Sequence, residues 1–466
     1  MKAMSLKWIV LIFLNMIIFQ SCNTDADTDI IDTASTISVS DDTTTLITEW
    51  NNLWVSIDQY TEDMRPNSVT RALAYIHLTG YETAVPFMSN YSSNSERYSN
   101  LNINFSNLED NINLNLGLNA AYAEVIDHFM INLESGVRQN ISDFKNSKSV
   151  TLTTGLSSSE IENSENWGKY VAKRIIDFSK SDSDAEWQID NPTPKNYIAP
   201  VGIGLWEAKE SEDAWFPYWR KVRTFAITPE ESSSVAFDDV LQYSTSTSSD
   251  YYQQMNDVYQ TTITANTENN EDLWIAEFWA DDVEGLMISP PGRQFSIATQ
   301  LIKQYDLSYD KALELLLRLG FSINDAAVSA WDDKYTYNIE RPSNYITKYI
   351  DESFTTNLSR FIQEENPAFP SYPSGHATFA AAAAGVFINF FGTDNISFTD
   401  NTYTNSINIS FNGSPRSFTS FSEMARENAY SRVPLGVHIE QDAIEGLRLG
   451  YEIAEAVNNL NLQLRN

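Results

Sequence analysis

Residues 369–387 read FPSYPSGHATFAAAAAGVF, a proline-punctuated segment followed by an alanine-rich run with almost no helix breaker. The pattern predicts a loop that turns directly into a helix at Ser374. The first N–H groups of a helix lack intrahelical partners and lie at the positive end of its dipole, so they bind oxyanions. Gly375 allows close approach of an anion, and His376 titrates near neutral pH. Taken alone, the segment is more simply a capped helix with a surface histidine.

A second segment supplies positive charge. In WDDKYTYNIERP, residues 331–342, Lys334 and Arg341 stand seven positions apart, which is two helical turns. Both side chains are therefore predicted to lie on one face of a helix. Arginine offers a planar fork to adjacent oxyanion oxygens, and lysine offers a point charge.

A third segment, SRVPLGVHIEQD at residues 431–442, contains Arg432, His438 and Asp442. Asp442 follows His438 by four positions, close enough to fix the tautomer of its ring if a helix has begun there. Each segment alone is more often a salt-bridged helix surface. However, the chain has only four histidines, and two of them fall in these segments, which favours one joint oxyanion site. His77 and His128 lie in amphipathic helical patterns and are interpreted as structural.

The three segments together resemble, in order and spacing, the signature of the type 2 phosphatidic acid phosphatase and vanadium-dependent haloperoxidase superfamily. The matching residues are Lys334, Arg341, Ser374, Gly375, His376, Arg432, His438 and Asp442. Residues 70–84 (TRALAYIHLTGYETA) and 277–293 (EFWADDVEGLMISPPGR) also resemble the haloperoxidase branch. The resemblance thus covers most of residues 45–460, and it implies an α-helical fold with two four-helix bundles.

The resemblance also implies roles for the matched residues. His438 would bind vanadium, while Lys334, Arg341, Ser374, the Gly375 N–H group and Arg432 would hold the oxygens of vanadate, or of phosphate in the same site. His376 would be the acid–base group, Lys334 would polarise bound peroxide, and Asp442 would hold His438.

Three further residues match the family less directly. Asp282 falls where the family has an acid that pairs with the arginine matching Arg432. Trp331 and Phe369 fall beside the halide site, although either ring is equally well explained as part of the core.

The function implied is a vanadate-dependent haloperoxidase that oxidises halide with hydrogen peroxide to hypohalous acid. Iodide or bromide is favoured because these halides are the easier to oxidise. The first alternative is an acid phosphatase in which His438 forms a phosphohistidine and His376 protonates the leaving oxygen. The second is a non-catalytic surface lipoprotein that binds oxyanions or glycans. The large first half, the Trp331 and Phe369 matches, and the absence of the membrane spans of lipid phosphatases favour the haloperoxidase.

The N-terminal sequence MKAMSLKWIVLIFLNMIIFQSC predicts a lipoprotein-like signal peptide over residues 1–22, because a basic start precedes a short apolar run. Cys22 is the only cysteine, so it would carry a lipid anchor to the membrane and no intramolecular disulfide forms. Residues 23–45 are rich in Thr, Asp and Ser and predict a disordered tether. The protein is therefore expected to be exported, either as a membrane-anchored lipoprotein or as a periplasmic or extracellular protein.

A net charge of −33 argues against nucleic acid or an anionic membrane surface as a partner. The predicted fold class is mainly α, with two fused helical bundles at 46–228 and, for the catalytic half, 229–466. A small β-hairpin is predicted near 395–412. Apolar spacing predicts helices at 68–87, 116–133, 160–179, 233–252, 271–279, 293–305, 309–334, 420–430 and 442–460.

Overall fold

The computed structural model describes residues 39–208, 213–232, 234, 241–267, 270–281, 283–360, 366–404 and 411–463, and residues 40–466 form one compact unit. Its longer helices are α1 (Val39–Asp58), α2 (Asn67–Ala84), α3 (Leu114–Phe129), α4 (Ser135–Leu152), α5 (Ser158–Lys180), α7 (Asp250–Ala265), α9 (Pro290–Gln304), α10 (Tyr309–Tyr337), α12 (Gly375–Phe391), α13 (Phe421–Tyr430) and α15 (Glu440–Asn458). The shorter helices are α6 (Ser183–Asp190), α8 (Glu271–Phe278), α11 (Pro342–Tyr349) and α14 (Arg432–Leu435), with 3-10 turns at Val85–Phe87, Asn94–Glu96, Phe105–Asn107, Trp219–Lys221 and Asn357–Arg360. The predicted mainly helical fold class is confirmed.

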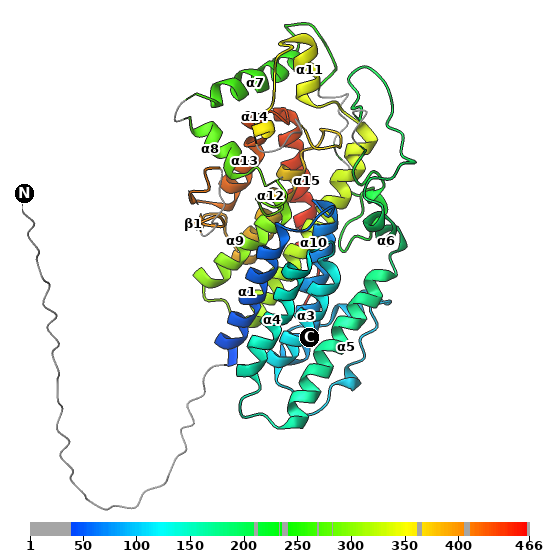
Figure 1. The fold of residues 1–466 in the computed structure, drawn as a ribbon, viewed down its shortest axis with the longest axis vertical. Helices are drawn as coiled ribbons and strands as arrows, with labels where there is room; N and C mark the ends of the chain where they lie inside the picture. Colours follow the sequence, from blue (N-terminus) through cyan, green and yellow to red (C-terminus); the bar gives the residue numbers. More distant parts are fainter. Residues whose placement is uncertain are drawn as a thin grey trace, which may run out of the picture. The chain divides into compact units, whose positions relative to one another are not determined.

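Helix α10 is the centre of the unit. Every residue from Ala312 to Trp331 is buried, as expected of a helix that has neighbours on all sides. It packs against α2 and against both α12 and α15, while α3 packs against α2, α4 and α5. Figure 1 shows α3, α4 and α5 at one end of the unit and α7, α8 and α11 at the other. Because α10 contacts helices from both halves of the sequence, the division into two bundles at residue 228 stays a prediction.

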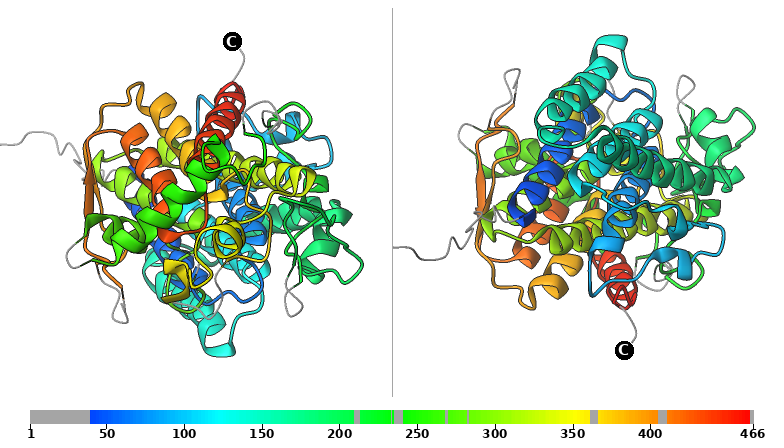
Figure 2. Two further views of the ribbon diagram at one scale, coloured as in Figure 1. Left: turned by 90° about the horizontal axis from the view of Figure 1, so that it is seen from above. Right: turned by 90° about the horizontal axis from the view of Figure 1, so that it is seen from below.

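The small sheet differs from the predicted hairpin. Strand β1 (Phe398–Asp400) pairs antiparallel with β2 (Arg416–Phe418), so the second strand lies beyond the predicted range of 395–412. The pleat explains this register, because Phe398 faces Phe418 on the buried side with ring centroids 5.5 Å apart, while Thr399 and Ser417 pair outside. Residues 405–410 of the predicted hairpin lie outside the described residues. The two strands lie at one edge of the unit (Figure 2).

The predicted tether is too long. Helix α1 begins at Val39, so residues 39–45 belong to a helix, whereas residues 1–38 lie outside the described residues. The threonines that suggested disorder are bound: Thr43 donates to the Asn115 side chain at 2.6 Å, and Thr44 donates to the Leu307 carbonyl at 3.1 Å. The polar composition therefore concealed a helix whose hydroxyls find partners on α3 and in the loop between α9 and α10.

The predicted helix at 233–252 is wrong over residues 241–249, and only residues 250–252 fall in a helix. Residues 241–249 are not helical, and α7 starts only at Asp250, with Ser249 accepting from the Tyr252 N–H group at 3.2 Å. Residues 233 and 235–240 lie outside the described residues. Among the helices that the structure describes, none is both long and apolar enough to cross a membrane.

Candidate active site

The loop before α12 ends as the sequence predicts. Ser374 is the N-cap, and its hydroxyl accepts from the Ala377 N–H group at 3.4 Å. Its own N–H group donates to the Asp442 carbonyl at 2.9 Å, which ties the start of α12 to the start of α15. A side chain at Gly375 would bring its Cβ atom within 3.3 Å of the Trp331 ring, so glycine allows the ring to cover the helix start.

Lys334 reaches this loop from the end of α10. Its side chain is fully buried, and Nζ donates to the carbonyls of Pro370, Ser371 and Pro373 at 3.0, 2.8 and 2.6 Å. Burial lowers the pKa of Lys334 well below its usual value, and the nearby Arg341 charge lowers it further. The lysine therefore both holds the loop and adds positive potential beside the helix start.

Arg341 and His438 are in direct contact. Arg341 precedes α11 in extended conformation, and its side chain donates to the Phe369 and Val437 carbonyls at 3.1 and 3.0 Å. Its Nη1 atom lies 3.1 Å from His438 Nε2. Because arginine can only donate, His438 Nε2 must be the acceptor, and the ring proton therefore sits on Nδ1.

Asp442 holds that tautomer. Its Oδ2 atom lies 2.8 Å from His438 Nδ1 and also accepts from the Ser371 hydroxyl at 2.5 Å. Burial raises the pKa of Asp442 to about 6, although the Ser371 hydroxyl and the cationic neighbours oppose the shift. Burial also lowers the pKa of His438 well below its usual value, with Arg341 and Lys334 adding to the effect. His438 is thus a neutral ring whose Nε2 lone pair is directed at the Arg341 guanidinium group.

Arg432 and His376 both line the cavity, and both contact the Ala280 carbonyl oxygen. His376 Nε2 lies 3.1 Å from the Ala280 carbonyl oxygen, which can only accept, so Nε2 carries a proton. Arg432 Nη1 lies 3.4 Å from the carbonyl oxygens of both Trp279 and Ala280. The segment that follows α8 therefore supplies the carbonyl groups that orient two charged or titratable side chains of the site.

These side chains surround one narrow buried cavity. Its lining residues are Pro66, Pro290, Trp331, Arg341, Pro367, Phe369, Gly375, His376, Phe379, Arg432 and His438. Two arginines and two histidines face an apolar wall. Burial is the main cause of the lowered pKa values of Lys334 and His438, and the neighbouring cations lower them further. Such a cavity suits a small oxyanion, because negative charge would offset the converging positive charge.

The sequence predictions for this site can now be placed. The structure brings together Lys334, Arg341, Ser374, Gly375, His376, Arg432, His438 and Asp442, with Trp331 and Phe369 packed 5.0 Å apart between ring centroids. Asp282 lies outside the described residues. The helical spacing argument for Lys334 and Arg341 is wrong, because α10 ends at Tyr337, where left-handed Asn338 terminates it.

Sequence reasoning missed Ser371, which bonds Asp442, and the Ala280 carbonyl group. Pro66, Pro290 and Phe379 in the cavity wall were also missed. A serine in a proline-rich loop has no periodicity to mark it, and a backbone carbonyl has no sequence signal at all. Only the position of Ser371 within residues 369–387 could have drawn attention to it.

Comparison with known proteins gives concordant results. Residues 314–466 match a family model described as the VCPO second helical-bundle domain. The chain is 32% identical over 164 residues to a vanadium-dependent bromoperoxidase from Ascophyllum nodosum, an alignment that covers 34% of this chain and 26% of that protein. The chain thus spans about a quarter of the length of this curated relative.

Solved structures resemble the fold over a longer stretch. The first bacterial vanadium-dependent iodoperoxidase superposes with a TM-score of 0.77 at 23% identity, covering 93% of this chain and 99% of that one. A holo-type bacterial vanadium-dependent chloroperoxidase superposes with a TM-score of 0.61 at 15% identity, covering 85% and 92% of the two chains. At these identities the superpositions establish the fold.

Proposed function

We propose that this chain is a vanadate-dependent haloperoxidase that oxidises iodide or bromide with hydrogen peroxide to hypohalous acid, in keeping with its similarity to vanadium-dependent haloperoxidases. The observation that carries the proposal is the convergence of Arg341, Arg432 and neutral His438 on one buried cavity. The Nζ atom of buried Lys334 lies behind this lining, 5.2 Å from the centroid of the Phe369 ring. That combination provides cationic donors for oxygens and one lone pair for a metal centre.

The residues present fit vanadate. His438 Nε2 would be the metal ligand, because Asp442 keeps the proton on Nδ1. Arg341, Arg432, the Ser374 hydroxyl and the N–H group of Gly375 would hold the oxygens. Lys334 would join them by exchanging one of its three carbonyl acceptors for an oxygen of the anion. When bound, vanadate supplies a Lewis-acidic centre that activates peroxide without changing its oxidation state.

We propose that His376 transfers protons and that Lys334 stabilises negative charge. Since His376 donates from Nε2 to the Ala280 carbonyl, Nδ1 is the ring nitrogen that would exchange a proton with bound peroxide. Lys334 Nζ lies in the same site, and a bound oxyanion would oppose the lowering of its pKa by burial, so that its charged form would stabilise negative charge as the peroxide O–O bond breaks.

The aromatic wall is proposed to receive the halide. Lys334 Nζ lies 5.6 Å from the Trp331 ring centroid and 5.2 Å from that of Phe369. Trp331 Nε1 is buried and has no hydrogen-bond partner among the described residues, so an N–H donor is present at this wall. A polarisable halide suits such a site, and the curated relative named as a bromoperoxidase supports a halide of this kind.

Activity assays on protein freed of bound anions test this proposal. We expect oxidation of iodide or bromide by peroxide to appear only after vanadate is added. The side chains of the cavity would hold the oxyanion, but they do not themselves activate peroxide. The readout is triiodide formation or bromination of a dye, with chloride as a third substrate. Hydrolysis of para-nitrophenyl phosphate that vanadate inhibits, without halide oxidation, would instead establish the phosphatase alternative.

We further propose that the protein is exported and anchored through a lipid on Cys22. The proposal is supported by the basic start, the short apolar run and the single cysteine that ends it. In bacterial cells we expect the parent to fractionate with membranes and to carry fatty acyl groups by mass spectrometry. The Cys22→Ser variant should lose both properties, and a variant that keeps the acyl mass would contradict the assignment.

A further inference from the structure

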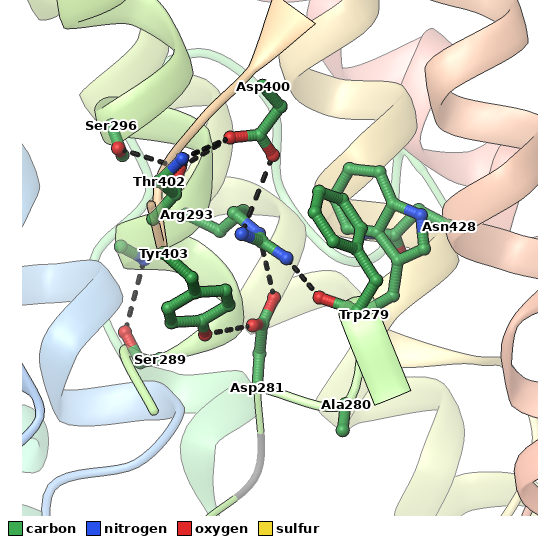
Figure 3. A network of polar contacts seen from close by, with 12 residues as sticks. Trp279, Ala280, Asp281, Ser289, Arg293, Ser296, Asp400, Thr402, Tyr403 and Asn428 are labelled. Carbon is green, nitrogen blue, oxygen red and sulfur yellow. Dashed lines mark hydrogen bonds and ion pairs between the residues drawn. The ribbon is translucent and has the colours of Figure 1, made fainter. Parts of the chain in front are cut away.

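A second buried charge cluster lies beside the cavity, and the proposed chemistry does not use it. Arg293 on α9 is fully buried between two buried carboxylates, with Nε 3.4 Å from Asp281 Oδ2 and Nη1 3.5 Å from Asp400 Oδ2. Figure 3 shows its guanidinium group between these two side chains. The Tyr403 hydroxyl donates to Asp281 Oδ1 at 2.5 Å and completes the cluster.

Fold stability alone explains this cluster poorly. Buried ion pairs are often no more stabilising than apolar residues of the same volume, and here one cation faces two carboxylates. In addition, Asp281 has a φ of 47°, in the left-handed region that side chains other than glycine rarely adopt. Burial acts to lower the pKa of Arg293, but Asp281 and Asp400 overcome this and raise it, so the guanidinium stays charged.

Arg293 binds the Phe278–Asp281 segment, whose Ala280 carbonyl contacts His376 in the active site. It donates to the Phe278 carbonyl and pairs with the Asp281 side chain, so it holds both ends of the Phe278–Asp281 segment. Its guanidinium carbon also lies 4.9 Å from the centroid of the Trp279 ring. Ala280 lies between these two contacts in the sequence, and its carbonyl group accepts from His376 Nε2.

Asp400 pairs with Arg293 and is itself held in place by other groups. Its Oδ1 atom accepts from the Thr402 N–H group at 3.0 Å and from the Thr402 hydroxyl at 2.5 Å. The carboxylate is therefore held by the turn that follows β1, independently of Arg293. The chain of contacts runs from the small sheet through Arg293 to Ala280 and on to His376.

We propose that Arg293, clamped between Asp281 and Asp400, is a positioning residue that holds the Ala280 carbonyl where it keeps His376 in the Nε2–H tautomer. The effect on turnover rests on the proposed function, because it is exerted through the acid–base role of His376. The effect on the His376 ring does not rest on it and can be measured in protein without vanadate.

The test compares Arg293→Gln with a neutral variant in which Arg293→Met, Asp281→Asn and Asp400→Asn are combined. The neutral variant removes the clamp without leaving buried charge unpaired, and the prediction is the same for both. The control is Arg318→Gln, which breaks another buried ion pair, to Glu314, at the far end of α10. Circular dichroism checks that each variant is folded.

The decisive measurement is nitrogen-15 NMR of histidine-labelled protein, with the His376 signal assigned by its loss in His376→Gln. We expect the parent and Arg318→Gln to show an Nε2–H tautomer at His376, and the two clamp variants to show a mixture of tautomers. With vanadate and peroxide, kcat should fall by about 10- to 100-fold in the clamp variants. Arg293→Lys should recover part of the Nε2–H tautomer population and part of the lost kcat, because it restores the positive charge.

Three outcomes would overturn the proposal. A folded clamp variant that keeps the parental His376 tautomer would show that Arg293 does not position the carbonyl. The same tautomer loss in Arg318→Gln would show a general effect of lost stability. Failure of both clamp variants to fold would make Arg293 a structural residue. If the parent oxidises no halide, the proposed function fails, yet the NMR comparison still decides the positioning role.

Discussion

His438→Ala is expected to abolish vanadate binding and halide oxidation together. The neutral ring offers Nε2 as the proposed metal ligand, and Asp442 holds Nδ1 at 2.8 Å so that this lone pair is available. Changing a residue that merely supports a metal ligand typically weakens affinity by about 10- to 100-fold. Loss of the ligand itself should exceed that range, while the arginines retain a weak attraction for the oxyanion.

Equilibrium dialysis of vanadate, followed by iodide oxidation at saturating peroxide, measures the two losses. The control is His128→Ala, since His128 is half-buried at the end of α3 and does not line the cavity. His438→Ala that binds vanadate as tightly as the parent would show that the ligand assignment is wrong. Loss of oxidation with unchanged binding would point to a role for His438 in catalysis alone.

The helices that the sequence predicted well are those with a clear apolar stripe. Residues 160–179 gave α5, because Trp167, Val171 and Ile175 repeat along one buried face. Helix α4 was missed because Ile141 is its one fully buried residue among those described, so the pattern is too polar to stand out. The tether boundary was wrong for a related reason, since threonines of α1 bind groups that are distant in the sequence, on α3 and in the loop before α10.

The site shows the same limit at the level of single residues. Charged residues in unusual patterns were found from the sequence, and the structure gathers them around one cavity. Their geometry was not found: Arg341 reaches the site from an extended residue ahead of α11, and not from the helix of Lys334. The supporting groups, Ser371 and the Ala280 carbonyl, come from long-range contacts that no local pattern encodes.

Gly450→Ala is expected to destabilise the fold by about 2 kcal/mol, although alanine normally favours a helix over glycine by up to about 1 kcal/mol. Helices α12 and α15 pack along each other, and Gly450 faces α12. An added Cβ atom would lie 2.7 Å from the Ala381 Cβ atom and closer still to the Thr378 carbonyl oxygen. Because the nearer contact is to backbone, the helices themselves must move apart.

The matched control is Gly136→Ala in α4, where nothing lies within 4 Å of an added Cβ atom. The same substitution there should stabilise by about 0.5–1 kcal/mol through helix propensity alone, and urea unfolding compares the two. Gly450→Ala at least as stable as the parent would show that the close helix contact can relax without loss.

One turn earlier, a Cβ atom added at Gly446 would lie 2.6 Å from the Ser374 carbonyl oxygen, so this contact also sets the distance between the start of α12 and Asp442. Vanadate affinity should therefore fall in Gly446→Ala even at temperatures where the variant remains folded, which separates a displaced site from an unfolded chain.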